Sequence, residues 1–530
     1  MWLFLFLGLL PGICLCTFPT VDLGYARHAP TSINTTTLNT KYATYRNIRF
    51  AQPPVGDLRF RRPVTPPPGS VEVQNGVLPK NSTNCVQTWP SWMTVIPGLN
   101  GTTWGHEDCL FLDVYVPEGL AEASASTGVP VLHWIYGGGY IFGAKDTGNN
   151  PGAILADANP DEKFIVVASN YRLGPFGWMS SDTESSISQN NGLYDALAGL
   201  SWTNEYIHLF GGDPEKVTII GQSAGGGIIE YLLAADAQGK DVHFNQAIIS
   251  SPGYRPHVNR SMDMTSIYKN FLNATDCDNA QCLRNLPEED LIKANAQIML
   301  TGDLGPFGGP GIGFGPVQDG ELAPALPENV FKDPKNHSKG KVKRIIAGGM
   351  KHDGIGNQNT TWKEMLQQFA SNPSQSAIDS VAKLYGNEKG FQTSQDKFYG
   401  DIIYECHSYL AAKYWADTTP KCAPTKFQSY RYDQSIPKAF HGDDVNYYFY
   451  DDVLAKLNPS VVAPVAKTFQ NYVRRFLLGK DMEDWPEFGA DMKWMNITAD
   501  GFKPVVGKDE ATRAKRCDQI VELLQNNYGW

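Results

Sequence analysis

One pentapeptide constrains the fold of this chain more than any other feature. Gly221-Gln-Ser-Ala-Gly225 stands between the apolar, β-branched run Val217–Ile220 and the apolar stretch Gly226–Ala235. Small residues on both sides of a serine let a strand and a helix approach closely through a sharp turn, which imposes strained backbone angles on the serine. The pattern therefore predicts a strand, a turn and a helix. The hydroxyl of Ser223 is expected at a helix N-terminus, whose partial positive charge favours developing negative charge.

Apolar runs of strand length recur along the chain and alternate with helical patterns. Runs that are apolar on both faces are typical of buried strands in a parallel sheet. Helical patterns cover Leu193–Tyr206 and Gly225–Ala234. This alternation predicts an α/β fold, with a mostly parallel central sheet and helices on both faces. The expected strands are Val131–Tyr136, Phe164–Ser169, Val217–Ile220, Gln246–Ile249, Arg344–Ala347 and Phe427–Tyr432.

The composition of the whole chain narrows its organisation and its partners. The 530 residues are 42% hydrophobic and 19% charged, which is ordinary for a globular protein with a large core. Long α/β proteins often form one unit, so we expect a single domain over residues 17–530. The formal net charge is -10 and no basic cluster occurs, which argues against a nucleic-acid partner.

The N-terminus and the glycosylation patterns predict export. Residues 1–16 are uncharged and apolar, but too short to span a bilayer comfortably. We expect a secretory signal peptide that is cut near Cys16, with a short membrane anchor as the alternative. Eight Asn-x-Ser/Thr sites fit a secreted glycoprotein. They are Asn34, Asn81, Asn100, Asn259, Asn273, Asn336, Asn359 and Asn496.

The cysteines point to disulfides rather than to a metal site. Removal of the signal peptide leaves seven cysteines, whose spacings match no zinc or redox pattern. An odd count leaves one thiol unpaired. No metal and no cofactor are expected. The seven are Cys85, Cys109, Cys277, Cys282, Cys406, Cys422 and Cys517.

Several motifs together resemble one family. Phe210–Gly225 is similar to the serine signature of type-B carboxylesterases, which include cholinesterases and fungal lipases, and Glu107–Pro117 is similar to their second signature. Further similar segments follow in family order from about residue 40 to the C-terminus. They are Ala51–Phe60, Asn170–Gly177, Asn191–Asp195 and Phe314–Gly320. The resemblance implies the α/β-hydrolase fold and ester hydrolysis by a serine.

A glycine triplet provides candidate donors for an oxyanion. Gly137–Gly139 follows the expected strand Val131–Tyr136, and glycines let the backbone approach a substrate closely. Preorganised N–H groups stabilise the negative oxygen of a tetrahedral intermediate. By resemblance to the family, the N–H groups of Gly138, Gly139 and Ala224 form this oxyanion hole.

The base and the acid should follow the serine in the order Ser, Asp or Glu, His. His441 opens the segment His-Gly-Asp-Asp-Val-Asn-Tyr-Tyr-Phe, which resembles the family's base segment. Asp353, within Gly348-Gly-Met-Lys-His-Asp-Gly354, resembles its acid segment, although the family commonly has Glu there. Ser251 resembles a serine of the family, and the resemblance implies that it hydrogen-bonds the triad. The competing acids are Asp319, Asp443 and Asp444.

The resemblance also implies disulfide pairs. It joins Cys85 to Cys109 and Cys277 to Cys282. Cys517 resembles a cysteine that pairs with one at the position of Cys406, but a Cys406–Cys422 pair remains the rival.

The sequence thus predicts a secreted serine ester hydrolase that acts on a small-molecule ester, with no stable membrane span. Two alternatives stay open. One is a lactonase or acyltransferase that acts on a specialised metabolite. The other is a neuroligin-like binding protein that kept the fold and lost catalysis. The sequence leaves the oligomeric state open.

Overall fold

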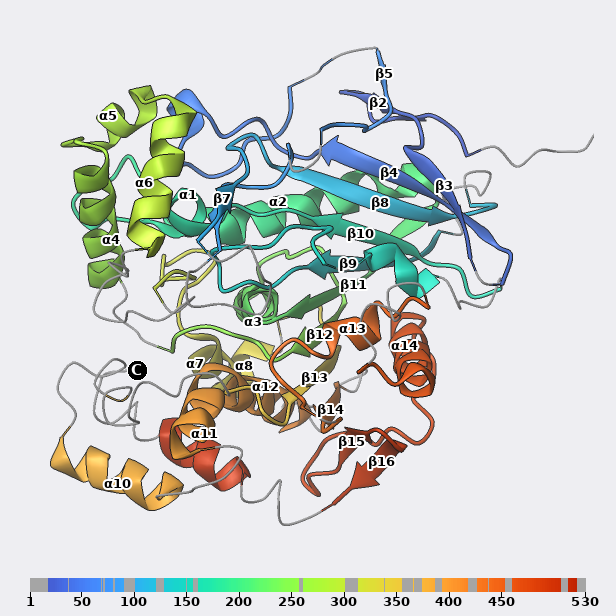
Figure 1. Ribbon diagram of the computed structural model, residues 1–530. Coiled ribbons are helices and arrows are strands. Elements are labelled where there is room, and N and C mark those ends of the chain that lie inside the picture. The colour runs from blue at the N-terminus through green and yellow to red at the C-terminus, as the bar shows by residue number, and fades with distance from the viewer. Residues whose placement is uncertain are drawn as a thin grey trace, which may run out of the picture.

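Among the described residues, eleven strands form a twisted sheet at the centre of the computed structural model (Figure 1). The structure describes residues 18–36, 38–67, 69, 72–79, 82–89, 101–120, 128–148, 150–155, 161–256, 261–300, 313–337, 339–354, 366, 374–386, 393–417, 427–436, 438–452, 460–506 and 513–521. The strand order is β16-β15-β14-β13-β12-β11-β9-β10-β8-β4-β3.

The middle of this sheet is parallel and its edges are antiparallel. The parallel strands are β10 (Ile165–Ser169), β9 (Val129–Ile135), β11 (Gly212–Gln222), β12 (Gln246–Ser250), β13 (Arg344–Met350), β14 (Gln428–Gln434) and β15 (Trp494–Thr498). The antiparallel strands are β8 (Phe111–Pro117), β4 (Lys41–Arg49), β3 (Ser32–Thr35) and β16 (Gly501–Val505). All six strands expected from the sequence are present, so the predicted α/β class with a mostly parallel sheet is confirmed.

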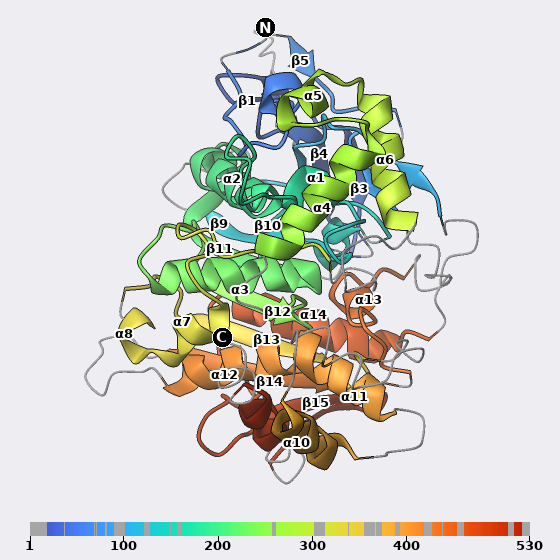
Figure 2. The same ribbon diagram turned by 90° about the vertical axis from the view of Figure 1, so that its left-hand side faces the viewer.

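Helices flank the strands, as the alternation in the sequence predicts. The helix after the serine, α3 (Ala224–Ala237), packs on β11 and β12, and α14 (Ala463–Leu477) lies on the other side of β12 (Figure 1). Helix α12 (Cys406–Asp417) packs on β13 and β14. Three helices gather away from the sheet centre (Figures 1 and 2): α4 (Ser261–Ala274), α5 (Ala280–Asn285) and α6 (Glu288–Leu300).

The remaining elements are short or peripheral. A small sheet contains β1 (Val21–Asp22), β2 (Arg27–His28) and β5 (Val73–Gln74), and a hairpin pairs β6 (Gln87–Thr88) with β7 (Thr103–Trp104). The other α-helices are α1 (Gly174–Trp178), α2 (Asn191–Tyr206), α7 (Pro327–Lys332), α8 (Pro334–His337), α10 (Gln375–Tyr385), α11 (Ser394–Gly400) and α13 (Val445–Tyr448). Short 3-10 helices are η1 (Gly56–Leu58), η3 (Pro151–Leu155) and η4 (Ile207–Phe210), and η5 (Asp401–Glu405) is a π-helix.

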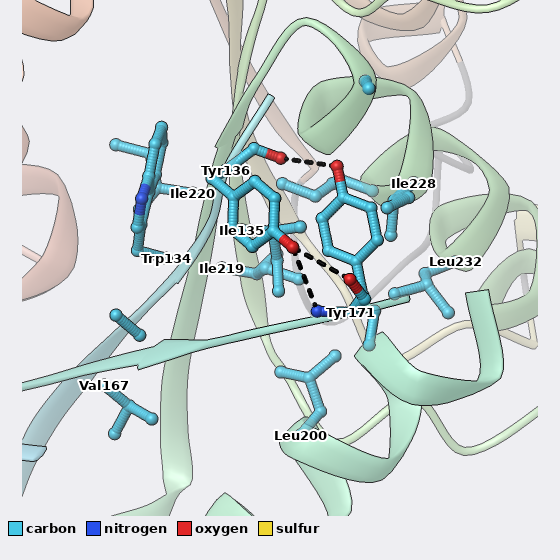
Figure 3. Packing of buried hydrophobic residues seen from close by; sticks show 14 of the residues in the cluster. Trp134, Ile135, Tyr136, Val167, Tyr171, Leu200, Ile219, Ile220, Ile228 and Leu232 are labelled. Carbon is cyan, nitrogen blue, oxygen red and sulfur yellow. Dashed lines mark hydrogen bonds between the residues drawn. The ribbon is translucent and has the colours of Figure 1, made fainter. Parts of the chain in front are cut away.

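The carboxyl end of β9 is anchored by a pair of tyrosines (Figure 3). The hydroxyl of Tyr136 donates to the carbonyl oxygen of Tyr171 over 2.9 Å, and the hydroxyl of Tyr171 donates to the carbonyl oxygen of Tyr136 over 3.0 Å. The two rings stack with their centroids 4.4 Å apart. Burial raises the pKa of both hydroxyls, so they remain neutral donors. The pair fixes the chain where it enters the glycine triplet.

Within the described ranges, three disulfides join distant or neighbouring segments of the chain. They are Cys85–Cys109, Cys277–Cys282 and Cys406–Cys517. Both pairs that the resemblance implies are present, and Cys406 pairs with Cys517 rather than with the rival Cys422, which lies outside the described residues. Among the helices in the described part of the chain, none combines the length and apolar character needed to cross a bilayer.

Candidate active site

Ser223 occupies a strained turn between β11 and α3. Its φ of 57° and ψ of −124° lie in a region that residues with a side chain rarely adopt. Three backbone hydrogen bonds hold it there: its N–H donates to the carbonyl oxygen of Ser250, and its carbonyl oxygen accepts from Gly227 and Gly253 over 2.9 and 2.8 Å. The predicted strand, turn and helix are therefore present. The hydrogen bonds to the end of β12 and to the turn after it hold Ser223 in this strained conformation.

The glycines of the pentapeptide are required by close packing. A Cβ atom on Gly225 would lie 2.2 Å from the carbonyl oxygen of Ile135, and one on Gly221 would lie 2.7 Å from the backbone of Gly225. Backbone atoms cannot move aside without separating the strand from the helix. Helix α3 can thus pack directly against the end of β9 only because these side chains are missing.

The structure brings Ser223, His441 and Asp353 together from the ends of three strands. The Oγ atom of Ser223 lies 2.8 Å from Nε2 of His441, which follows β14. The Nδ1 atom of His441 lies 2.9 Å from Oδ1 of Asp353, which follows β13. Carboxyl ends of parallel strands meet at one edge of the sheet, so residues distant in sequence converge there. With Nδ1 protonated, Nε2 can accept the serine proton.

Asp353 is almost fully buried, at 5% exposure, and its carboxylate is held by several donors. The Ser251 hydroxyl lies 3.0 and 2.9 Å from its two oxygens, and the N–H of Met350 donates to Oδ2 over 3.0 Å. A Cβ on Gly349 would come within 2.7 Å of that oxygen. The shorter Asp thus reaches the imidazole from a tight turn, and Ser251 contacts the acid as the resemblance implies.

The turns that carry the acid and the base are themselves linked. The N–H of His352 donates to the carbonyl oxygen of Ala439 over 3.1 Å, and His352 forms a β-bridge with Phe440. His352 therefore joins the acid turn to the base turn through its backbone.

The three competing acids have other partners. Oδ1 of Asp319 accepts from the N–H groups of Glu321 and Ala323 within its own turn. Oδ2 of Asp443 caps its own turn at the N–H of Phe440. Asp444 is fully buried and accepts hydrogen bonds from Ser250 and Tyr432. Of the four acids that the sequence offered, only Asp353 hydrogen-bonds His441.

Asp444 nevertheless lies close enough to influence the site. Burial raises the pKa of its carboxyl to about 6, because the charged form is poorly solvated there, although the hydrogen bonds from Ser250 and Tyr432 oppose the shift. The hydroxyl of Tyr432 lies 2.7 Å from Oδ2 of Asp444 and 2.7 Å from the hydroxyl of Tyr448. This polar network thus includes a residue that follows His441 by three positions.

A second serine–histidine pair occurs inside the sheet and has a different character. Nε2 of His133 lies 2.9 Å from the hydroxyl of Ser169, and its Nδ1 lies 3.0 Å from Thr203. Both members are completely buried, and burial lowers the pKa of His133 to about 3. A hydroxyl stands where a carboxylate would be needed to stabilise an imidazolium. The hydrogen bonds of His133 therefore satisfy polar groups that are buried inside the sheet.

The predicted oxyanion donors border the serine turn. Gly138 and Gly139 have positive φ values of 116° and 58°, and Ala224 is the first residue of α3. No acceptor for their N–H groups occurs among the described residues. A Cβ on Gly137 would lie 2.9 Å from Cβ of Ser223, so the triplet lies directly against the serine. Unpaired N–H groups here are suited to receive a negative oxygen.

Two residues beside His441 were missed by the sequence reasoning. Nε2 of Gln222 lies 3.2 Å from Nε2 of His441, and the ring of Tyr404 stacks on the imidazole with centroids 4.1 Å apart. Gln222 is part of the pentapeptide, so its nearness to the serine could have been anticipated. Tyr404 lies 181 positions beyond the serine in no recognised motif, and no signal in the sequence marks it.

The described residues contain no group of three or more His, Cys, Asp or Glu side chains that could hold a metal ion. The chemistry at hand is that of a hydroxyl, an imidazole, a carboxylate and backbone amides. The α/β sheet and the groups at the carboxyl ends of its parallel strands are those of the α/β-hydrolase class of proteins.

Comparisons with known proteins identify the family. The model of the carboxylesterase family matches residues 31–519, so the chain belongs to the carboxylesterase family and is a carboxylic ester hydrolase. It is 30% identical to the carboxylesterase patB of Aspergillus clavatus, over 94% of this chain and 95% of that protein. It is also 30% identical to lipase 1 of Geotrichum candidum, over 92% of each chain.

Solved structures agree on the fold. EstA of Aspergillus niger superimposes with a TM-score of 0.76 at 22% identity, covering 97% of this chain and 99% of that one. The predicted α/β-hydrolase fold is thereby confirmed, and the match to the carboxylesterase family model confirms the resemblance to type-B carboxylesterases.

Proposed function

We propose that this protein is a secreted serine carboxylic ester hydrolase that works through an acyl-enzyme, with Ser223 as nucleophile, His441 as base and Asp353 as the orienting acid. The observation that carries the proposal is the continuous hydrogen-bonded line from Ser223 Oγ through both nitrogens of His441 to the buried carboxylate of Asp353. The fully buried His133 pair has no such carboxylate.

The arrangement performs acyl transfer in two halves. Nε2 of His441 takes the serine proton as Oγ attacks the ester carbonyl, and Asp353 stabilises the resulting imidazolium. The N–H groups of Gly138, Gly139 and Ala224 stabilise the tetrahedral oxyanion, each contributing about 3–4 kcal/mol by analogy with measured cases. His441 then returns the proton to the leaving alcohol. A water molecule, activated by the same imidazole, releases the acid from Ser223. The chemistry requires no metal or cofactor.

Labelling with a fluorophosphonate tests the nucleophile. The wild-type protein should label and should hydrolyse a short p-nitrophenyl ester, whereas Ser223→Ala should do neither. Ser169→Ala is the matched control, because it removes the hydroxyl of the other serine–histidine pair and should leave labelling intact. Labelling of Ser223→Ala at the wild-type rate would refute the proposed nucleophile.

Export is the second part of the proposal. Residues 1–16 would be removed as a signal peptide, leaving a mature domain of residues 17–530 that is glycosylated at sites among the eight predicted asparagines. Of these, Asn273 is exposed and Asn34, Asn336 and Asn496 are half-buried, while Asn81, Asn100, Asn259 and Asn359 lie outside the described residues. Three disulfides and similarity to a secreted lipase of Arthroderma benhamiae support an extracellular location.

Expression in a eukaryotic host tests export. The protein should accumulate in the medium, begin near Thr17 on N-terminal sequencing, and lose mass on treatment with an endoglycosidase. Retention in the cell with residues 1–16 intact would instead indicate the alternative of a membrane anchor.

A further inference from the structure

A π-helical turn lies beside His441. The turn η5 (Asp401–Glu405) separates α11 from α12, and its fourth residue is Tyr404. The ring of Tyr404 stacks on the imidazole with centroids 4.1 Å apart and planes inclined by 29°. Single π-helical turns insert one extra residue into a helix and are frequent at functional sites, because they redirect a side chain. Here the redirected side chain covers one face of the imidazole.

The ring of Tyr404 is itself closely confined. A Cβ on Gly253 would lie 2.7 Å from its Cε1 atom, so the ring occupies space that only a glycine leaves open. The N–H of Gly253 donates to the carbonyl oxygen of Ser223, and the ring of Tyr399 packs edge-on at 6.0 Å. Burial raises the pKa of Tyr404 well above its usual range. A neutral aromatic ring therefore fills the gap between the turn that follows β12 and His441.

Both ends of the turn are held by the C-terminal helical residues 513–521. Arg516 donates to the carboxylate of Asp401 over 2.7 Å, and Tyr385 donates to the same carboxylate over 2.8 Å. At the other end, Glu405 pairs with Arg513 over 2.9 Å and also with Arg431.

The Cys406–Cys517 disulfide begins at the next residue of the chain and ties this helical segment, red in Figure 1, to α12. Two ion pairs and one disulfide from residues 513–521 thus fix the five residues of the turn and its neighbour Cys406. Largely buried ion pairs can restrict conformation even where their net contribution to stability is small.

We propose that Tyr404 is a positioning residue for His441, and that residues 513–521 clamp the π-helical turn that carries it. The side chain of His441 is the exposed member of the constellation, at 26%, against 2% for Asp353. A stacked ring limits rotation of the imidazole and stabilises its cation through the aromatic face. The inference rests on the proposed role of His441 as the base.

Replacement of Tyr404 tests whether its ring positions His441. Tyr404→Leu should lower kcat about tenfold and leave KM within about twofold, because a misplaced base slows chemistry more than binding. Tyr404→Phe keeps the ring and should recover most of the lost kcat. Equal losses in both variants, or no loss in Tyr404→Leu, would overturn the positioning role. An active Ser223→Ala would instead overturn the proposed function itself, so the two failures are distinguishable.

A double-mutant cycle tests the clamp. Cys406→Ser with Cys517→Ser should lower kcat several-fold in the wild-type background and produce no further loss in Tyr404→Leu, since both changes release the same ring. Arg516→Gln, which keeps the disulfide, should behave in the same way. The matched control is Cys277→Ser with Cys282→Ser, which opens a disulfide elsewhere and should leave kcat unchanged. If the clamp variants lowered kcat by the same factor in Tyr404→Leu as in the wild type, the clamp would be contradicted.

Discussion

Gln222 places a neutral amide beside the imidazole, with its Nε2 atom 3.2 Å from Nε2 of His441. A carboxylate at this position would favour the charged imidazolium. In Gln222→Glu, the pH at which half of kcat/KM is lost on the acid side should therefore rise by about one unit. The measurement is a pH–rate profile with a p-nitrophenyl ester.

Gln222→Met serves as the control for this change. It has a similar length, adds no charge and removes the amide hydrogen bond. The acid side of its pH–rate profile should stay at the wild-type position. An equal displacement in both variants would mean that the lost hydrogen bond, not the added charge, moves the profile.

Asp444 should make stability depend on pH. Its pKa rises from an ordinary 3.8 to about 6 in the folded protein, because burial disfavours the charge. The folded state thus binds the proton more tightly than the unfolded chain does. The stabilisation from this proton is complete below about pH 4 and disappears as the pH rises through about 6, a change of roughly 3 kcal/mol.

In Asp444→Asn this dependence should vanish. The free energy of unfolding of the variant, relative to wild type, should increase between pH 4 and 7 by about 2–3 kcal/mol. Urea unfolding at several pH values measures the change. The pH trend is the decisive quantity, since an unpaired amide hydrogen would add a constant cost at every pH. A parallel trend in both proteins would show that Asp444 ionises normally.

Individual site residues differed in how far the sequence revealed them. Ser223 lies in a contiguous motif between a strand and a helix, so local patterns were sufficient. His441 and Asp353 required the family resemblance, because local patterns do not say which distant loops meet. Tyr404 depends on a helix irregularity and on packing against Gly253, and neither feature leaves a periodic signal.

At the scale of elements, the turn after β13 places the acid. A Cβ on Gly349 would lie 2.7 Å from Oδ2 of Asp353 and 2.9 Å from Oγ of Ser251. Gly349→Ala should therefore displace the carboxylate and lower kcat by about 100-fold, the usual cost of a misplacement near 1 Å. Steady-state kinetics with circular dichroism measures both activity and folding.

Gly489→Ala is the matched control for this substitution, since a Cβ there would meet nothing within 4 Å. It should retain wild-type kcat. Gly349→Ala with full activity would show that the acid turn tolerates the added methyl group by shifting elsewhere.

Six strands were predictable because their sequences are apolar on both faces. The run Arg344–Ala347 predicted β13 (Arg344–Met350), which continues three residues further. Strands β15 and β16 were not predicted. Strand β16 lies at the edge of the sheet with no buried residue, and residues such as Lys503 interrupt its apolar pattern, while β15 pairs between it and β14. Edge strands depend on pairing, which local sequence does not encode.

At the scale of the whole molecule, the site depends on contacts between distant segments. Residues 223, 353 and 441 meet only after β11, β13 and β14 are aligned in parallel with β12 between β11 and β13. The parallel order of the strands explains why local patterns predicted the class of fold but did not predict that these three residues meet. Disulfides add covalent links between segments of the chain.

Those disulfides close loops of very different length, which predicts a ranking of their contributions to stability. Cys406 and Cys517 are 111 positions apart, whereas Cys277 and Cys282 are 5 apart. The entropy that a cross-link removes from the unfolded chain grows with the logarithm of loop length. Replacing Cys406 and Cys517 by Ser should therefore cost about 2–3 kcal/mol more than replacing Cys277 and Cys282 by Ser. Urea unfolding of both variants, without reductant, provides the comparison. Equal losses would mean that native contacts around Cys277–Cys282 outweigh the entropy of the shorter loop.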